Sequence, residues 1–373
     1  MKIFIRIVKW TLISLFSLVL VISILNFVPF TISSVSKNNT FLKEGKYPLI
    51  IPHGGAKELV PENTVFAYNY LMEHYNPQVL EIDLAMTADG QLISQHDLYL
   101  TMSPGSQLDK AFVRSHSYAE IVQAIKADDY YLARTFTEPE DLGGQQPYKD
   151  LDANDPIMQQ MIPARIRDIF EEVNDKVLYI LEIKDAPEEG NKNGYTPGLH
   201  DYKAAAAELI SLVREFNLEG KVVLASFSDE VTDYFKENAP EMLMAAATSE
   251  VTMWAVLSAF NLDFFWPIKS EVLILPNPSS MRIQGGTAKL LDIIPSIFRD
   301  YIALPEGDYY RANFMHAQMI NDAHRKGMAV LYWTVDDPEE MKLLIELGAD
   351  GIITDRPDLL KALIDQMKAE EQN

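Results

Sequence analysis

The feature that most constrains the fold is a repeated alternation of short apolar runs with stretches of helical periodicity. After residue 46 the apolar runs of strand length are 47–52, 79–85, 176–184, 221–226, 242–247, 272–275, 328–334 and 351–354. The helical stretches between them include 64–74, 202–216, 230–237, 313–326 and 338–347. Alternating strands and helices are typical of a parallel sheet, and eight such units close into a barrel. We therefore predict an α/β fold, a TIM (β/α)8 barrel, over residues 47–373.

Three segments depart from this alternation. The link Thr87-Ala88-Asp89-Gly90 is too short for a parallel crossover, so it predicts an antiparallel hairpin on the barrel rim that returns the chain to His96. Segments 98–161 and 277–311 are long and rich in turn-forming residues, and we interpret them as insertions at the catalytic face of the barrel. Surface elaborations without a catalytic part fit the same pattern.

An uncharged apolar segment, residues 10–36, precedes the predicted barrel and follows Lys2, Arg6 and Lys9. It is long enough to cross a hydrocarbon core of ~30 Å, so we predict a transmembrane helix within residues 1–36 and a linker over 37–46. A cleaved signal peptide is the alternative, although the apolar segment exceeds the usual length of that region. The basic residues ahead of the span place the N-terminus in the cytoplasm and the barrel outside it.

Charge and composition exclude several classes of protein. The formal net charge is −22 at pH 7 and no dense Lys/Arg block follows the apolar segment, which argues against a nucleic-acid partner. The chain has no cysteine, which excludes disulfides, thiolate zinc sites and a cysteine nucleophile. The chemistry of this chain must therefore depend on other side chains and on bound ions.

Two acids interrupt the apolar run at residues 79–84. Glu81 and Asp83 lie two positions apart, so both side chains project from the same face of the predicted strand. A parallel barrel strand buried on both faces is normally apolar throughout. Two unpaired carboxylates facing the barrel axis would repel each other and lose hydration at a cost of several kcal/mol per ion. We therefore predict that a cation lies between them.

A second strand adds a carboxylate to the same end of the barrel. Glu182 and Lys184 share the inward face of run 176–184. Carboxylates from two neighbouring strands form a site for a hard divalent cation, Ca²⁺ or Mg²⁺. The alternative is that Glu182 pairs with Lys184 and that Asp83 caps the hairpin.

Two histidines are predicted at this end as well. His53 follows the first apolar run and His96 follows the hairpin. Imidazoles with a pKa near 6.5 beside a metal site suit general acid and base roles in hydrolysis. The other histidines fall on predicted helices or loops and receive no role: His74, His116, His200, His316 and His324.

Taken in order, these motifs resemble those of the glycerophosphodiester phosphodiesterase family. The resemblance rests on His53-Gly54-Gly55-Ala56, Pro61-Glu62-Asn63-Thr64, Glu81-Ile82-Asp83, Thr87-Ala88-Asp89-Gly90, His96-Asp97, Glu182-Ile183-Lys184, Trp333-Thr334-Val335 and Gly351-Ile352-Ile353-Thr354-Asp355-Arg356-Pro357. It extends from about residue 50 to residue 360. It implies a TIM barrel that uses one divalent metal to hydrolyse glycerophosphodiesters to glycerol 3-phosphate and an alcohol.

The resemblance also implies roles for individual residues. The metal ligands would be Glu81, Asp83 and Glu182, and the acid and base would be His53 and His96. Substrate or phosphate would contact Lys184, Gly54, Glu62, Asn63 and Trp333. For the Pro61–Thr64 segment a structural role is the alternative, with Asn63 or Thr64 capping the helix that follows.

One position departs from the family pattern. The family usually has His-Arg-Gly, whereas Gly54 stands at the middle position here. A guanidinium can bind phosphate oxygens in a bidentate manner, which glycine cannot do. Three explanations stay open: another cation such as Lys57, Arg165 or Arg311 substitutes, the substrate differs, or activity is lost.

Three functions are consistent with this sequence. The first is a membrane-anchored phosphodiesterase acting on glycerophosphodiesters or lysophospholipid head groups. The second is a phospholipase-like enzyme that cleaves a different lipid head group on the same barrel. The third is a catalytically silent barrel that binds a phosphorylated ligand or a protein partner. The full set of carboxylates and histidines favours the enzymes, because a binding protein does not require it.

Overall fold

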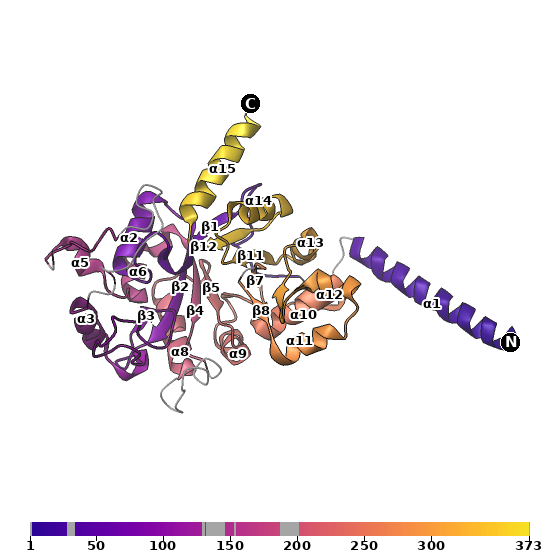
Figure 1. Ribbon diagram of the computed structural model, residues 1–373, viewed down its shortest axis with the longest axis horizontal. Coiled ribbons are helices and arrows are strands. Elements are labelled where there is room, and N and C mark those ends of the chain that lie inside the picture. Colours follow the sequence, from indigo (N-terminus) through magenta and orange to yellow (C-terminus); the bar gives the residue numbers. More distant parts are fainter. Residues whose placement is uncertain are drawn as a thin grey trace.

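The computed structural model describes residues 2–27, 34–128, 131, 146–152, 154–186, 201–278 and 280–372. Parallel strands form its centre and helices surround them (Figure 1). The parallel strands are β1 (Leu49–Pro52), β2 (Val79–Met86), β4 (Leu178–Ile183), β5 (Val222–Ala225), β6 (Leu243–Met244), β7 (Val272–Pro276), β11 (Ala329–Trp333) and β12 (Gly351–Thr354). Each coincides with one of the apolar runs predicted as strands.

Backbone hydrogen bonds join these strands in barrel order. Parallel ladders run from β2 through β4 and β5 to β6, and from β7 through β11 and β12 to β1. Between the two sheets the Ala246 amide donates to the Val272 carbonyl at 2.9 Å. At the other junction β1 lies beside β2.

One buried apolar cluster fills the space inside the strands. Every parallel strand contributes to it, through Ile51, Val79, Ile180, Val223, Leu243, Val272, Ala329 and Ile353. Side chains from all the strands meet in one cluster because the sheet curves back on itself, as in TIM barrels. The predicted TIM barrel is confirmed.

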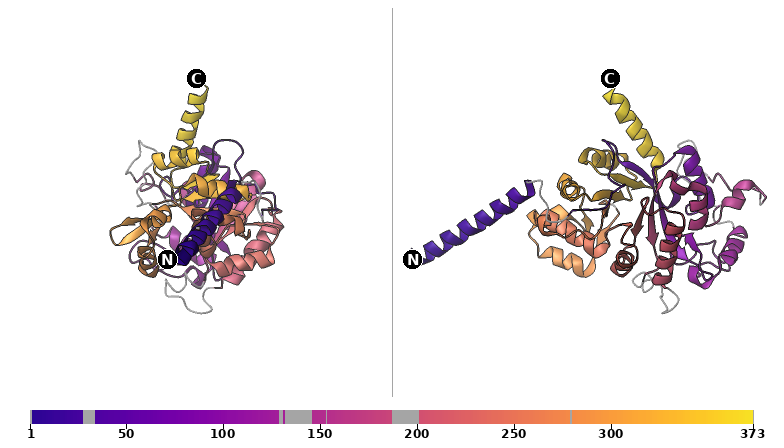
Figure 2. Two further views of the ribbon diagram at one scale, coloured as in Figure 1. Left: turned by 90° about the vertical axis from the view of Figure 1, so that its right-hand side faces the viewer. Right: turned by 180° about the vertical axis from the view of Figure 1, so that it is seen from behind.

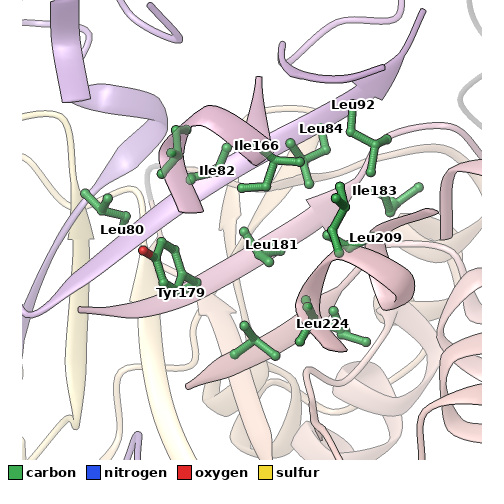
Figure 3. Close-up of a cluster of buried hydrophobic side chains, with 14 of the residues drawn as sticks. Leu80, Ile82, Leu84, Leu92, Ile166, Tyr179, Leu181, Ile183, Leu209 and Leu224 are labelled. Carbon is green, nitrogen blue, oxygen red and sulfur yellow. The ribbon is translucent and has the colours of Figure 1, made fainter. Parts of the chain in front are cut away.

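The outer face of the strands carries a second set of apolar side chains. Leu80, Ile82 and Leu84 of β2 pack with residues of β4 and with Ile166 and Leu209 of the covering helices (Figure 3). Since side chains alternate along a strand, this outward set turns Glu81 and Asp83 toward the barrel axis. The hydrophobic pattern of β2 therefore sets the direction of both carboxylates.

The helices around the barrel follow the strands in sequence. They are α2 (Val65–His74), α6 (Ile166–Val173), α8 (Tyr202–Glu215), α9 (Asp229–Asn238), α10 (Thr248–Ala259), α13 (Ala317–Arg325), α14 (Pro338–Leu347) and α15 (Pro357–Glu371). Side chains cap the starts of α2, α8 and α14, with Asp201 in that place at α8. The Thr64 hydroxyl accepts from the Ala67 amide at the start of α2, and Asp337 accepts from two amides at the start of α14. The capping role considered for Thr64 is confirmed.

The predicted hairpin is also present. Strand β3 (Leu92–Ser94) pairs antiparallel with the end of β2, where Leu84 lies opposite Ser94 and Met86 lies opposite Leu92. This pairing extends the rim and delivers the chain to His96.

Both long segments contain regular structure where they are described. The first has η2 (Val113–Ser115), α3 (Tyr118–Lys126) and α5 (Pro156–Gln160), and its positions 129–130, 132–145 and 153 lie outside the described residues. Its apolar side chains pack on the hairpin through Ala85 and Ile93. The second contains α11 (Gly285–Asp292), α12 (Ser296–Ile302) and an antiparallel sheet of β8 (Arg282–Ile283), β9 (Ala303–Glu306) and β10 (Tyr309–Ala312).

Helix α1 (Lys2–Phe27) projects away from the barrel (Figures 1 and 2). Its window Phe4–Val21 has a mean hydropathy of 2.0 and none of it is buried. Length and composition are sufficient to cross a membrane, although a signal sequence has the same properties. Residues 35–43, which follow it, lie against the barrel through hydrogen bonds to Lys326, Glu271 and Asp350.

Candidate active site

The predicted catalytic residues meet at the carboxyl end of the barrel. His53 begins the short helix η1 (His53–Gly55) directly after β1, and Glu81 and Asp83 lie on β2. In the parallel register Asp83 is the partner of Glu182 on the neighbouring strand β4. Active sites of TIM barrels lie at this end, where the loops leave the strands.

Three of these side chains form a compact group. One ligand atom from each of His53, Glu81 and Asp83 lies within 4.8 Å of the other two. Glu81 and Asp83 are buried, with 5% and 2% of their surface exposed. Buried carboxylates at this separation repel each other, and a divalent cation between them would remove the repulsion. The donor set fits a divalent metal.

The pKa values of the two carboxyl groups are shifted in opposite directions. Burial, followed by the negative charge of Asp83, raises the pKa of Glu81 to about 8. Burial alone would raise the pKa of Asp83 too, but the Lys184 ammonium lies 3.0 Å away and holds it at about 2. Two buried carboxyl groups that oppose each other's ionisation are consistent with a site that binds a cation.

Lys184 forms a bridge between two strands. Its Nζ lies 2.8 Å from Glu182 Oε1 and 3.0 Å from Asp83 Oδ1. The ion pair between Glu182 and Lys184, which was the structural alternative at the sequence level, is thus present. The Asp83 side chain pairs with Lys184, and its backbone carbonyl, not its side chain, accepts from the Gln95 amide after the hairpin.

A buried aspartate orients His53. The Nδ1 atom of His53 lies 2.8 Å from Asp355 Oδ1, which leaves Nε2 as the ring atom for proton transfer or metal binding. Burial lowers the pKa of the imidazole, but Asp355 and Glu81 outweigh it and raise the pKa of His53 to about 9. Asp355 follows β12, the strand paired with β1, so closure of the barrel brings it to His53.

His96 occupies a more open position at the same cavity. Its Nδ1 lies 3.1 Å from Asp97 Oδ1, and this hydrogen bond raises the pKa of His96. His96 and His53 line one cavity of about 180 Å³ together with Asp83, Glu62 and Asn63. The two predicted acid and base residues thus share one space with a predicted metal ligand.

Asn63 has a structural role in this cavity. It adopts a positive φ of 62°, its amide donates to the Gly54 carbonyl at 2.8 Å, and its Oδ1 accepts from the Ser94 hydroxyl at 2.8 Å. These bonds tie the loop after β1 to the hairpin. Asn63 therefore positions the loop that carries His53.

Of the cations considered as replacements for the missing arginine, Lys57 is the one that lines the cavity. Its Nζ lies 3.1 Å from Asp355 Oδ2, and 40% of its side chain is exposed. Arg165 pairs with Asp168 at 2.7 Å, and Arg311 pairs with Glu306 in the β9–β10 hairpin. The structure thus brings one of the three candidates to the site.

Comparison with known proteins identifies the family. Residues 53–359 match the Glycerophosphoryl diester phosphodiesterase family. The chain belongs to this family. A glycerophosphodiester phosphodiesterase of Caldanaerobacter subterraneus subsp. tengcongensis is 23% identical over 320 residues, which are 85% of this chain and 97% of that protein. The resemblance inferred from the motifs is confirmed, and the chain is a phosphoric diester hydrolase by class.

Two further relatives extend the comparison. A lysophospholipase D of Rattus norvegicus is 24% identical over 322 residues, covering 85% of each chain. A solved structure of an Oleispira antarctica phosphodiesterase, in complex with the product sn-glycerol-3-phosphate, matches with a TM-score of 0.53 and 16% identity. It covers 86% of this chain and 97% of that one, and it supports the barrel fold.

In this member of the phosphodiesterase family, an aromatic pair lies at the rim. Trp333 ends β11, and its ring meets that of Phe227 edge to face at 5.4 Å between centroids. Lys184 Nζ lies 5.5 Å from the centre of the Phe227 ring. Phe227 is 49% exposed, which is high for a large apolar side chain.

Asp355 and Phe227 were not predicted as site residues from the sequence. Asp355 lies inside the quoted motif at residues 351–357, and the expectation that the last barrel strand pairs with the first could have placed it beside His53. Phe227 directly follows the run at 221–226, so the sequence could have placed it at the carboxyl end of a strand. Its contact with Trp333 could not have been predicted, because their strands are separated in sequence and in the barrel.

Proposed function

We propose that this chain is a membrane-anchored, metal-dependent phosphodiesterase that hydrolyses glycerophosphodiesters to glycerol 3-phosphate and an alcohol. One observation carries the proposal: His53, Glu81 and Asp83 converge within 4.8 Å beside a cavity at the carboxyl end of a barrel. Family membership, the activity named for the Caldanaerobacter relative and the product bound in the Oleispira structure support the choice of substrate.

The proposed metal ligands are Glu81, Asp83 and Glu182. Carboxylate oxygens suit Ca²⁺ or Mg²⁺, and a bound cation would polarise a phosphoryl oxygen and lower the pKa of the nucleophile. With a cation satisfying Asp83 and Glu182, the Lys184 ammonium now paired with both becomes available to a phosphate oxygen.

Proton transfer is assigned to His53 and His96. One imidazole accepts the proton of the attacking hydroxyl, and the other donates a proton to the departing alcohol oxygen. Asp355 fixes the ring of His53, so its Nε2 carries the exchangeable proton. The attacking hydroxyl belongs either to water or to the neighbouring hydroxyl of the substrate glycerol.

Lys57 is proposed to supply the positive charge that Gly54 lacks. It lines the cavity, and its partner Asp355 also holds His53, so its ammonium is kept near the reacting group. A cation near the phosphate offsets the charge that develops on its oxygens during the reaction. Glu62 and Trp333 are proposed to contact the glycerol part of the substrate.

We further propose that α1 anchors the enzyme with its barrel outside the cytoplasm. The helix is apolar and exposed, and Arg6 and Lys9 lie near its N-terminal end. Residues 47–373 would then form one catalytic domain with insertions at about 98–161 and 277–311.

The test uses the full chain in detergent with glycerophosphocholine as substrate. We expect release of glycerol 3-phosphate, its loss on addition of a chelator, and its recovery with Ca²⁺ or Mg²⁺. His96→Ala should abolish turnover, whereas His74→Ala on the exposed end of α2 should leave it unchanged. Turnover that persists through chelation would remove the metal from the mechanism. A panel of diesters without any turnover would contradict the enzymatic proposal and favour a silent binding barrel.

A second candidate substrate is a lysophospholipid. The named activity of the Rattus norvegicus relative favours it, because that protein is a lysophospholipase D. If choline is released faster from lysophosphatidylcholine than from glycerophosphocholine, the preferred substrate is a lysophospholipid.

A further inference from the structure

A short segment fastens the N-terminal end of the chain across the base of the barrel. We call residues 35–43 the floor strap, the amino ends of the strands the floor, and their carboxyl ends the mouth. The strap begins where the Val35 amide donates to the Lys326 carbonyl at 2.8 Å. Its centre is Phe41, which is fully buried in the cluster that fills the barrel.

Polar bonds attach the floor strap along both sides of Phe41. Each partner lies just before a barrel strand. The bonds are Lys37 Nζ to the Met242 carbonyl at 2.6 Å, Asn39 Nδ2 to the carbonyls of Glu271 at 2.9 Å and Gly327 at 3.0 Å, Thr40 Oγ1 to the Gly220 carbonyl at 3.3 Å, and Lys43 Nζ to the Ala349 carbonyl at 2.9 Å. Lys37 also pairs with Glu271 Oε1 at 3.0 Å. The strap therefore contacts the starts of β5, β6, β7, β11 and β12.

The floor strap and the active site occupy opposite ends of the barrel. Along β2, Val79 lies in the floor half of the core and Asp83 lies at the metal-binding group. Four residue steps of strand separate them, roughly 13 Å. Helix α8 alone has 14 residues, so the surrounding helix layer is roughly 21 Å tall before any loops are added.

The chain between α1 and the strap is short. Residues 28–33 separate Phe27 from Ser34, and even a fully extended chain of this length spans roughly 25 Å. If the mouth faced the bilayer, Ser34 would lie on the far side of the helix layer and both loop layers, on the order of 30 Å or more from it. A span that begins after Lys9 needs about 20 residues to cross the hydrocarbon core, so Phe27 lies within it and adds no reach. The connection is too short for that orientation, because it would also have to pass around the helices.

We propose that the floor strap turns the catalytic mouth away from the bilayer that carries α1, so that the enzyme takes water-soluble glycerophosphodiesters and not lysophospholipids lying in that bilayer. This inference rests on the proposed function and on α1 as a membrane anchor. In this arrangement α1 holds the enzyme at the membrane, and the substrate reaches the active site from the aqueous phase.

The orientation can be measured directly, because the chain contains no cysteine. The full chain is reconstituted in phosphatidylcholine vesicles with a donor dye at one introduced cysteine. Gly220→Cys marks the floor and Ser249→Cys marks the mouth, and both positions are exposed and outside the catalytic group. Energy transfer to an acceptor on lipid head groups should be about twofold or more weaker from Ser249→Cys, given a separation of at least ~20 Å. Equal transfer, or stronger transfer from the mouth, overturns the inference.

Substrate choice is tested by lengthening the connection. The matched variant carries about 40 added Gly/Ser residues between Phe27 and Ser34, which span roughly 35 Å on average and let the mouth reach the bilayer. In vesicles, turnover of a long-chain lysophospholipid held in the same bilayer should rise about tenfold or more in this variant. Turnover of soluble glycerophosphocholine should be the same in both proteins.

The outcomes separate the inference from the function on which it rests. Equal, fast turnover of the bilayer-held lysophospholipid by the natural and lengthened chains overturns the inference while leaving a phosphodiesterase in place. Absence of glycerophosphocholine turnover by both chains overturns the proposed function and the substrate assignment with it. The energy-transfer result then still decides the direction of the mouth.

Discussion

Replacing Lys57 by methionine tests whether this lysine stands in for the arginine that the family usually carries. Methionine keeps most of the apolar stem and removes the charge, so packing in the loop after β1 is largely retained. Lys57 lines the catalytic cavity, and its ammonium lies 3.1 Å from Asp355. We expect Lys57→Met to lower kcat/KM while the protein stays folded.

The size of the effect follows from Coulomb's law. An ammonium about 4 Å from a phosphate oxygen contributes about 4 kcal/mol at an effective dielectric constant near 20. The Lys57 side chain is 40% exposed, so solvent screening reduces this to about 2 kcal/mol. Since each ~1.4 kcal/mol is a factor of ten in rate, kcat/KM should fall on the order of thirtyfold.

The control and the rescue make the experiment specific. Lys361→Met removes an exposed lysine of α15 far from the cavity and should leave kcat/KM unchanged. Gly54→Arg in the Lys57→Met background should restore about tenfold, because an arginine there can bind phosphate directly. A Cβ at Gly54 has space, with Asn63 Oδ1 the nearest atom at 3.6 Å, but its φ of 52° costs a non-glycine residue about 1 kcal/mol.

The assay is steady-state release of glycerol 3-phosphate from glycerophosphocholine. If kcat/KM of Lys57→Met stays within about threefold of that of the natural chain, the charge of Lys57 does not stabilise the transition state. Lys57 then does not replace the missing arginine. If Gly54→Arg fails to rescue while Lys57→Arg retains activity, the cation must approach from the position of residue 57.

Other expected outcomes concern the metal, the barrel floor and pH. Ca²⁺ or Mg²⁺ should raise the melting temperature of the natural chain, and Glu81→Ala should abolish this rise. His53→Ala should retain the rise and lose turnover. Equal behaviour of the two variants in both assays would contradict the assigned roles. Phe41 is fully buried, so Phe41→Ala should lower the free energy of unfolding by about 3–5 kcal/mol in urea titrations, and Phe41→Leu by much less. A loss below ~1 kcal/mol for the alanine variant would show that the floor closes without this side chain. Burial raises the pKa of Asp322 to about 6, so the folded state holds this proton more tightly than the unfolded chain and gains stability as pH falls from 7.5 to 5. Asp322→Asn should remove about 1 kcal/mol of that gain, and an unchanged pH slope would contradict the shift.

Much of the site was predictable because it lies within strands. Glu81 and Asp83 interrupt an apolar run at alternate positions, so strand periodicity alone turned both toward the barrel axis. That Glu182 lies at the same end also follows from two parallel strands, whereas the register that sets Asp83 opposite Glu182 comes from the structure. The pairing of Lys184 with Glu182 was one of the alternatives, but its pairing with Asp83 did not follow, because a side chain of that length can reach several partners.

Loops explain most of what the sequence left open. Lys57, Arg165 and Arg311 were equivalent candidates in the sequence, and the structure distinguishes them because only Lys57, among these three, lines the cavity. An asparagine at position 63 could cap a helix or contact a ligand. Its positive φ and the hydrogen bond from Ser94 show that it connects the loop after β1 to the hairpin. Such contacts depend on the three-dimensional path of each loop, which no local pattern specifies.

The sequence by itself determined the barrel, the inward direction of Glu81 and Asp83, and the end of the barrel at which the histidines lie. Local periodicity and strand order suffice for these features, because each strand has only two faces and parallel strands share one carboxyl end. Only the tertiary structure decided that Asp355 holds His53 and that residues 35–43 close the floor. These contacts join residues 180 to 307 positions apart in the chain, from Thr40 and Gly220 to Lys43 and Asp350. The bond between His53 and Asp355 exists only once the last strand has closed the ring against the first.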